Sequence, residues 1–205
     1  MKTVKKILIR LLLFWISLML LAVVVMCIPL FHNYDGEENG GDGFVYLIRD
    51  PFKKAAVRAY TYDPESGGSE IVIPESYGEY PVKGLGGYVG RGAPSPFMIY
   101  IRGVHFTESV GPKDGSFAWY AEQKGVEIEF VDLTLKLGPE IREIHADQDR
   151  GERSGDRLYV VRLYVECDPL NPEFYSEDGV LYTKDGKVVE GLHYRNSFET
   201  PEPTP

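Results

Sequence analysis

An uninterrupted apolar segment near the N-terminus constrains this chain more than any other feature. Residues 11–31 read LLLFWISLMLLAVVVMCIPLF and contain no charged side chain. At the helical rise per residue, a segment of this length spans roughly 31 Å, which is about the thickness of the hydrocarbon core of a bilayer. The sequence therefore predicts an N-terminal transmembrane helix over 11–31.

The charges on either side of this segment predict its orientation. The residues before it carry only basic charges, at Lys2, Lys5, Lys6 and Arg10. The residues that follow it are acidic, at Asp35, Glu37 and Glu38. Basic flanks stay on the cytoplasmic side of a membrane. We therefore expect a single-pass protein of the cell membrane, with its N-terminus in the cytoplasm and its C-terminal domain extracellular.

Two other interpretations of the apolar segment stay open. A cleaved signal peptide has a shorter apolar core and ends in small residues two positions apart, whereas Val25 and Cys27 would stand at those positions. Lipidation of Cys27 would need small residues directly before it, and Met26 stands there. An uncleaved anchor matches the sequence best, and all three interpretations place the rest of the chain outside the cytoplasm.

Changes of composition divide the chain into five parts. Residues 33–43 read NYDGEENGGDG, which is polar, acidic and typical of a flexible spacer. In the last six residues, TPEPTP, every second residue is proline, which favours an extended and disordered tail. The expected parts are a cytoplasmic basic stub (1–10), the transmembrane anchor (11–31), a flexible acidic linker (32–43), an extracellular β-rich domain (44–195) and a Pro-rich disordered tail (196–205).

Apolar runs and alternation predict that this domain is mainly β. The runs bounded by turn residues are 44–48, 56–62, 71–73, 97–101 and 158–165. Two further stretches alternate apolar with polar residues, namely Val126, Ile128 and Phe130, and then Leu133, Leu135 and Leu137. Such alternation is typical of a half-buried strand, and we expect the apolar members of both sets to face the core.

Local signals predict one short helix and one hairpin. Ser116 is a good N-cap for a helix over 116–124, and Gly125 is a good C-terminal stop. Between 180 and 190, two strand-like runs flank Asp185-Gly186. An Asp-Gly pair favours a two-residue type I′ turn, so we expect a terminal β-hairpin there.

A degenerate repeat is visible within the β-rich part. A short strand followed by proline or glycine recurs at IVIP (near 74), MIYIRG (near 103), LTLKLGPEIREI (near 144) and the strand from 158. The intervals of roughly 28 to 36 residues fall in the range of repeat architectures. The sequence favours a short, irregular β stack.

These segments resemble BspA-like leucine-rich-repeat proteins of bacterial cell surfaces. The resemblance lies in residues 59–63, 70–75 and 80–86, in 133–144, and above all in 171–187, which read NPEFYSEDGVLYTKDGK. The residues after Gly86 depart from the family pattern. The resemblance implies a short, degenerate leucine-rich-repeat-like β stack and a surface protein that binds and does not catalyse. It carries over no catalytic residues.

Charge and reactive residues exclude several classes of function. The net charge of −9 includes the basic N-terminal segment, so the rest of the chain is more acidic still, which disfavours nucleic-acid binding. The two cysteines, Cys27 and Cys167, form no CxxC pair, and the histidines show no HExxH spacing. We expect no cofactor, no metal site and no enzymatic activity.

Aromatic side chains are the best candidates for binding. Tyr80, Tyr88, Tyr100 and Trp119 lie in or near expected loops and strand ends, and such rings combine apolar area with a polar group. The favoured hypothesis is a non-catalytic domain that binds a protein or polysaccharide at the cell surface. The alternatives are an accessory or scaffold protein of a membrane complex and an envelope glycosidase, whose paired carboxylates no sequence motif would reveal.

Overall fold

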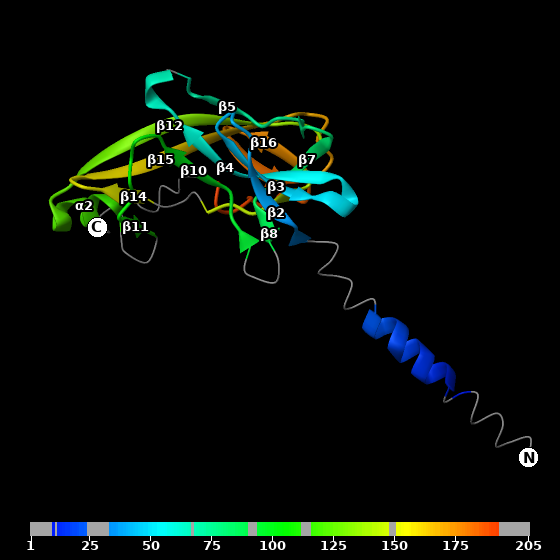
Figure 1. The fold of residues 1–205 in the computed structure, drawn as a ribbon. Coiled ribbons are helices and arrows are strands. Elements are labelled where there is room, and N and C mark those ends of the chain that lie inside the picture. Colours follow the sequence, from blue (N-terminus) through cyan, green and yellow to red (C-terminus); the bar gives the residue numbers. More distant parts are fainter. Residues whose placement is uncertain are drawn as a thin grey trace, which may run out of the picture.

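The computed structural model describes residues 10, 12–23, 33–66, 68–89, 94–111, 116–147 and 151–192. They form a β domain and a separate apolar helical segment that projects from it (Figure 1). The prediction of a mainly β fold is confirmed. The expected tail at 196–205 and residues 1–9 of the expected stub lie outside the described residues.

One sheet has seven strands in the order β13-β7-β4-β3-β2, with β10 paired to β4 and β6 paired to β7. Its strands are β2 (Gly36–Asn39), β3 (Phe44–Arg49), β4 (Lys54–Tyr62), β6 (Ser76–Tyr77), β7 (Tyr80–Leu85), β10 (Met98–Ile101) and β13 (Glu143–Ile144). The 3₁₀ turn η1 (Asp50–Phe52) joins β3 to β4 as an antiparallel pair. Strands β4, β7, β10 and β13 pair in parallel.

A second sheet has five strands in the order β11-β14-β15-β12-β5. Its strands are β5 (Glu70–Val72), β11 (Glu108–Val110), β12 (Glu127–Leu137), β14 (Gly151–Ser154) and β15 (Arg157–Cys167). The remaining elements are β1 (Asn33–Tyr34), β8 (Gly87–Val89), β9 (Pro94–Ser95), β16 (Phe174–Glu177), β17 (Val180–Thr183), the 3₁₀ turn η2 (Pro64–Ser66) and the helix α2 (Phe117–Lys124). Strands β12 and β15 run side by side along their whole length (Figure 1).

The parallel strands of the two sheets form two stacked coils. In the first coil the chain passes from β5 to β7, and in the second it passes from β12 to β13. Leu135 of β12 lies opposite Ile71 of β5, and Ile144 of β13 lies opposite Leu85 of β7. Equivalent positions of the two coils therefore stack on each other, as they do in a solenoid.

One of the predicted repeat strands does not belong to the stack. Strand β15 lies beside β12 in register, as a third layer. The expected repeat strand that ends near Gly103 is β10, which pairs with β4 in the other sheet. It is a strand, as predicted, but it does not continue the stack of β5, β12 and β15.

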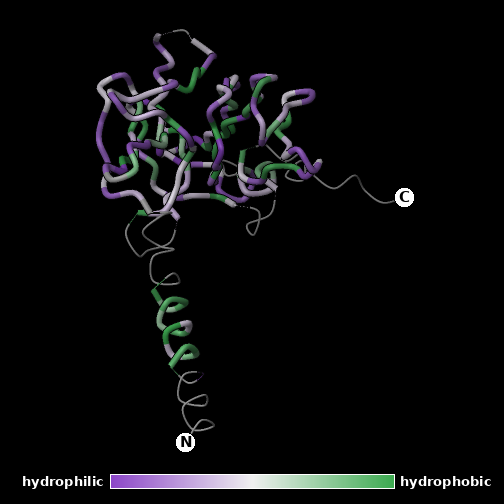
Figure 2. Tube along the Cα trace, turned by 90° about the vertical axis from the view of Figure 1, so that its right-hand side faces the viewer, coloured by the Kyte–Doolittle hydropathy of each residue, from purple (hydrophilic) through white to green (hydrophobic). Residues whose placement is uncertain are grey.

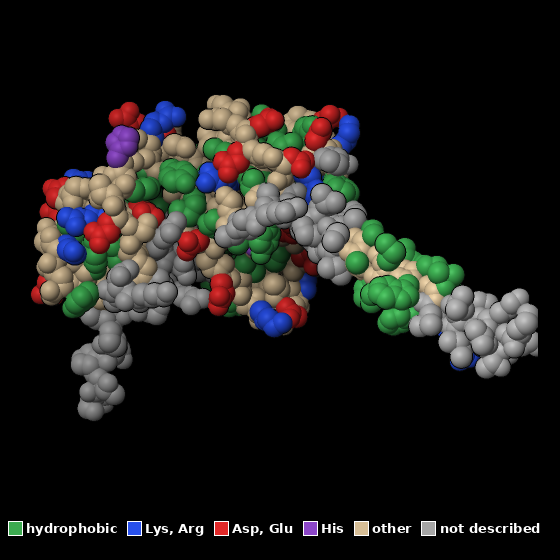
Figure 3. Space-filling model, turned by 60° about the horizontal axis from the view of Figure 1, so that its bottom comes forward, with side chains coloured by type: hydrophobic (Ala, Val, Ile, Leu, Met, Phe, Trp, Pro, Cys, Tyr) green, Lys and Arg blue, Asp and Glu red, His purple; other side chains and the backbone are tan. Residues whose placement is uncertain are grey.

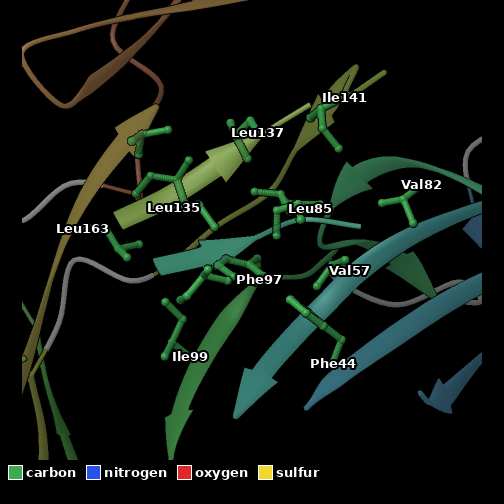
Figure 4. Close-up of a cluster of buried hydrophobic side chains, with 14 of the residues drawn as sticks. Phe44, Val57, Val82, Leu85, Phe97, Ile99, Leu135, Leu137, Ile141 and Leu163 are labelled. Atoms are coloured by element: carbon green, nitrogen blue, oxygen red, sulfur yellow. The ribbon is translucent and has the colours of Figure 1, made fainter. Parts of the chain in front are cut away.

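The long strands β12 and β15 bury opposite faces at their two ends. Near their C-terminal ends, Leu135 and Leu163 belong to the main core between the sheets. Near their N-terminal ends, Ile128 and Leu158 pack with α2 in a second core on the other face. Phe130, which alternation assigned to the buried set, is 43% exposed, so this part of the prediction is wrong. Figure 4 shows side chains of both sheets meeting in the main core.

The predicted helix is confirmed as α2. The Ser116 hydroxyl accepts a hydrogen bond from the Trp119 backbone N–H at 3.1 Å. Gly125 ends the helix in the left-handed conformation at φ 62°, which glycine adopts without a steric penalty. Phe117 and Tyr120 point into the second core. Capping and burial therefore act together at this helix.

The hairpin is present, but its two-residue turn is not at Asp185-Gly186. Strands β16 and β17 pair across Asp178-Gly179, where φ is positive at both residues, as a type I′ turn requires. At Asp185-Gly186 a wider turn makes only a single antiparallel bridge, between Tyr182 and Val188. Pairing across the earlier turn is favoured because it buries both Phe174 and Leu181 in the main core.

A buried asparagine joins this hairpin to the second coil. The Asn171 amide nitrogen donates to the carbonyls of Gly138 and Ile141, each at 3.0 Å. Its side-chain oxygen accepts from the backbone N–H groups of Glu173 and Phe174, each at 2.9 Å. All four hydrogen-bonding positions of the amide are used, so Asn171 satisfies backbone groups that neither a strand nor a helix satisfies.

The expected flexible linker is folded over most of its length. Residues 33–34 form β1, which pairs with β8, and residues 36–39 form β2, which pairs with β3. Tyr34 is buried and packs with Leu47 and Ala56. The prediction failed because β2 lies at the edge of its sheet, where Glu37 and Glu38 stay exposed, and because Tyr34 supplies an apolar contact that composition alone does not reveal.

The described part of the expected anchor, residues 12–23, is helical with exposed apolar side chains. Figure 2 shows this segment as mostly hydrophobic and apart from the domain. In the described residues no helix has both the length and the hydropathy needed for a membrane crossing. Residues 24–32 lie outside the described ranges.

Candidate binding surface

The structure separates the four aromatic residues that the sequence selected. Tyr80 lies on β7, Tyr88 on β8, Tyr100 on β10 and Trp119 on α2. Tyr88 makes an edge contact with the His145 ring at 5.2 Å between centroids. Within the described ranges none of the four rings contacts another, so they do not form one aromatic face.

Tyr80 has an internal hydrogen-bond partner. Its hydroxyl donates to Asp50 Oδ1 at 2.8 Å and so joins β7 to the turn η1. This hydrogen bond to the Asp50 carboxylate, reinforced by partial burial, raises the pKa of Tyr80 to about 12. The Tyr80 hydroxyl therefore acts first as a structural contact between two elements.

A different group of exposed side chains does share one surface. The side of β5, β12 and β15 that faces away from the main core carries three exposed apolar residues. They are Val72 (59% exposed), Phe130 (43%) and Tyr164 (52%). Since successive side chains of a strand alternate between faces, the buried positions Leu133, Leu135 and Leu163 place these neighbours outside.

Charged residues stand between these apolar side chains in a regular ladder. Asp132 lies directly opposite Arg162, and the Arg162 Nε donates to Asp132 Oδ1 at 2.6 Å. The same guanidinium stacks over the Phe130 ring, with its Cζ atom 4.5 Å from the ring centroid. We call the surface made by Val72, Phe130, Asp132, Lys136, Arg162 and Tyr164 the outer face.

Lys136 lies on the central strand β12, at the opposite end of the outer face from Phe130 and Arg162. Its ammonium lies 2.8 Å from the carboxylate of Glu70 on β5 and 3.7 Å from that of Glu166 on β15. The hydrogen bond from the ammonium to Glu70 is the main reason that the pKa of Lys136 lies above its usual value. The ion pairs hold three neighbouring strands in one polar row and leave Val72 and Tyr164 exposed beside it.

The turn of the hairpin borders the outer face. The Val165 backbone N–H donates to the Gly179 carbonyl at 2.8 Å. A Cβ atom at Gly179 would lie 2.9 Å from Cδ1 of Tyr164, so glycine at this turn leaves room for the tyrosine ring. The position of Tyr164 therefore depends on the hairpin as well as on β15.

Sequence reasoning could have found two of the six residues of the outer face. Alternation at Leu133, Leu135 and Leu137 implies that Asp132 and Lys136 point away from the core. The run 158–165 is almost continuously apolar and shows no alternation, so it gives no sign that Tyr164 is exposed. The pairing of β12 with β15, which brings these residues together, is visible only in the structure.

Cys167 and the acidic and histidine side chains are the groups of the domain that could act in catalysis or metal binding. Burial raises the pKa of the half-buried Cys167 thiol, which keeps it protonated at neutral pH. In the part of the chain that the structure describes, no three His, Cys, Asp or Glu side chains lie where they would hold a metal ion. Figure 3 shows acidic and basic side chains interspersed over one side of the domain.

Comparisons with protein-family models, with curated proteins and with solved structures gave no match.

Proposed function

We propose that this chain is a membrane-anchored, non-catalytic binding protein whose extracellular domain recognises a protein partner through the outer face. The observation that carries the proposal is the exposure of Val72, Phe130 and Tyr164 on one ordered sheet surface. Exposed apolar and aromatic groups that lie among paired charges are typical of protein interfaces. An ordered surface also loses little conformational entropy when it binds.

The anchor is the second part of the proposal. Residues 12–23 form a helix whose large apolar side chains, Trp15 among them, are exposed. Such a surface is unfavourable in water and favourable in lipid. The basic residues before the helix and the acidic residues after it favour an extracellular domain.

We further propose that the two coils and β15 are a short, degenerate leucine-rich-repeat-like stack of the BspA-like kind. The in-register pairing of β5 with β12 and of β12 with β15 supports this assignment. Asn171, which belongs to the segment of closest resemblance, binds four backbone groups between the coil and the hairpin. A surface-binding role agrees with this family assignment.

A second candidate is an accessory or scaffold protein of a membrane complex. It is favoured by the short distance between the expected anchor and the fold, because only His32 separates residue 31 from β1. A domain held so close to the bilayer is within reach of other proteins in the same membrane. The two candidates use the same outer face and differ in where the partner is located.

Site-specific photocrosslinking tests the proposal. A photoreactive amino acid replaces Tyr164 on the outer face, or Tyr100 on β10 as the control, in the full chain in its own membrane. We expect a saturable protein adduct from position 164 that excess unmodified chain displaces, and no such adduct from position 100. No adduct from position 164, or equal adducts from both positions, would refute the role of the outer face. An adduct that glycan-degrading enzymes remove would assign a polysaccharide.

A further inference from the structure

The chain enters the domain at a firmly held position. Strand β1 pairs in parallel with β8, with Tyr34 opposite Val89. Tyr34 is buried, and its ring occupies the space beside Gly87, where a Cβ atom would lie 2.5 Å from Cε2 of the tyrosine. One residue spans at most about 3.6 Å, so the single residue between the expected anchor and β1 holds the start of β1 close to the bilayer.

The turn η1 lies beside this position. The Asp35 backbone N–H, directly after β1, donates to the Ile48 carbonyl at 2.7 Å. The Asp50 backbone N–H at the start of η1 donates to Asp35 Oδ2 at 3.0 Å. Residues 50–54 are therefore among the parts of the domain nearest to the membrane when the anchor is inserted.

The side chains of this turn suit a lipid–water interface. Phe52 is 47% exposed although it is a large apolar residue. Lys53, which follows it, is exposed and reaches Glu79 at 2.7 Å. Aromatic rings and long cationic side chains are favoured where hydrocarbon meets headgroups.

A buried cation lies under the Phe52 ring. Arg49 is only 3% exposed, and the centre of its guanidinium lies 4.4 Å from the ring centroid. Its Nε and Nη1 atoms have no hydrogen-bond partner among the described residues. A buried guanidinium without an anion is costly, and the phosphate of a lipid headgroup is an anion that would offset this cost.

We propose that the turn η1 is a membrane-contact element that inserts the Phe52 ring among the lipid headgroups and places Arg49 and Lys53 at the level of the phosphates. The occupant of this surface is the same bilayer that holds the anchor, so the inference rests on the anchor of the proposed function. It fixes the domain against the membrane in one orientation, which a flexible linker would not do. The ring uncovers the Arg49 guanidinium as it moves into the lipid.

Tryptophan quenching in liposomes tests this orientation with the full chain. Three single-tryptophan proteins are compared in lipids with brominated acyl chains. One keeps Trp15 and carries Trp119→Phe, one keeps Trp119 and carries Trp15→Phe, and one carries both changes together with Phe52→Trp. Trp15 reports on the anchor, and Trp119, exposed on α2, reports on the part of the domain far from the chain's point of attachment (Figure 1).

We expect strong quenching of Trp15, clear quenching and a blue-shifted emission for the Phe52→Trp reporter, and little quenching of Trp119. Adding Arg49→Gln to the reporter protein is expected to reduce its quenching at least twofold. Quenching at position 52 no greater than that of Trp119, while Trp15 is quenched, would overturn the inference and leave the anchor intact. Absence of quenching at Trp15 would instead refute the anchor and, with it, this inference.

Discussion

Tyr34 and Gly87 fit together at the point where the chain enters the domain. The tyrosine ring lies where a side chain at position 87 would be, and Gly87 has a φ of 153°, which favours glycine. This contact fastens β1 to β8 within the three-stranded sheet β1-β8-β9. A segment that reads as a spacer is thereby fastened to the fold.

The Gly87→Ala variant tests this contact. The added methyl group would collide with the Tyr34 ring and would also strain the backbone. We expect a loss of about 1–3 kcal/mol in the free energy of unfolding, as in other overpacked sites. The measurement is urea unfolding of the full chain in detergent micelles. Gly138→Ala is the matched control, because a Cβ atom there meets nothing within 4 Å, and an equal loss in that variant would contradict the prediction.

Removal of the Asn171 amide is expected to be among the most costly polar substitutions. Asn171→Ala removes hydrogen bonds to four backbone groups of the second coil and the hairpin. The Ile141 carbonyl keeps a hydrogen bond from Arg142 Nη1 at 3.1 Å, and the other three groups are left without their partner. A buried unsatisfied group costs about 1–3 kcal/mol, and we expect a total loss of at least about 3 kcal/mol. Asn39→Ala, which removes one exposed hydrogen bond to Gly41, serves as the control. Similar unfolding midpoints for the two variants would be inconsistent with this role.

Two substitutions on β12 test its change of face. Leu135 is fully buried between the sheets, so Leu135→Ala is expected to cost about 2–5 kcal/mol. Phe130 is substantially exposed, so Phe130→Ala is expected to cost less than about 1 kcal/mol despite the larger side chain. Denaturant unfolding of both variants gives the comparison. If Phe130→Ala proves the more destabilising, Phe130 is buried, as the alternation of residues 126–130 predicts, and the change of face is refuted.

Glu108 is expected to make stability depend on pH at the end of the domain that carries α2. The Tyr120 hydroxyl donates to its carboxylate at 2.7 Å, and the Arg153 guanidinium lies at 3.4 Å. The hydrogen bond from Tyr120, with the nearby positive charges, lowers the pKa of Glu108 below its usual value. A carboxylate with a lower pKa in the folded state stabilises the fold above its unfolded-state pKa, and this contribution is lost as pH falls through the folded-state pKa.

The Glu108→Gln variant should therefore be less stable than the parent chain at pH 7, with a difference that shrinks below about pH 4. Unfolding by urea at pH 7, 5 and 3.5 measures this difference. Glu177→Gln, which changes an exposed carboxylate of β16, is the control and is expected to show no such trend. A difference between Glu108→Gln and the parent that is independent of pH would exclude a role for the ionised carboxylate.

Some features of the fold could be predicted because their signals are local. Ser116 and Gly125 define α2 by their own backbone and side-chain preferences. The strand runs were recognised from side chains only a few residues apart, and the expected strands at 44–48 and 97–101 correspond to β3 and β10. The segment 171–187 is recognisable in the sequence by its resemblance to a known pattern, although only the structure shows what Asn171 binds.

The candidate surface was decided by contacts between residues far apart in the chain. Whether Phe130 and Tyr164 are exposed depends on which side of β12 and β15 the main core and α2 cover. Whether Tyr34 belongs to a spacer or to the core depends on Gly87, which lies 53 positions later. The sequence by itself determined where strands, turns and the α2 helix can form, because these depend on short-range preferences. Tertiary structure alone decided which faces are buried, because burial is a property of the packed elements and not of any one of them.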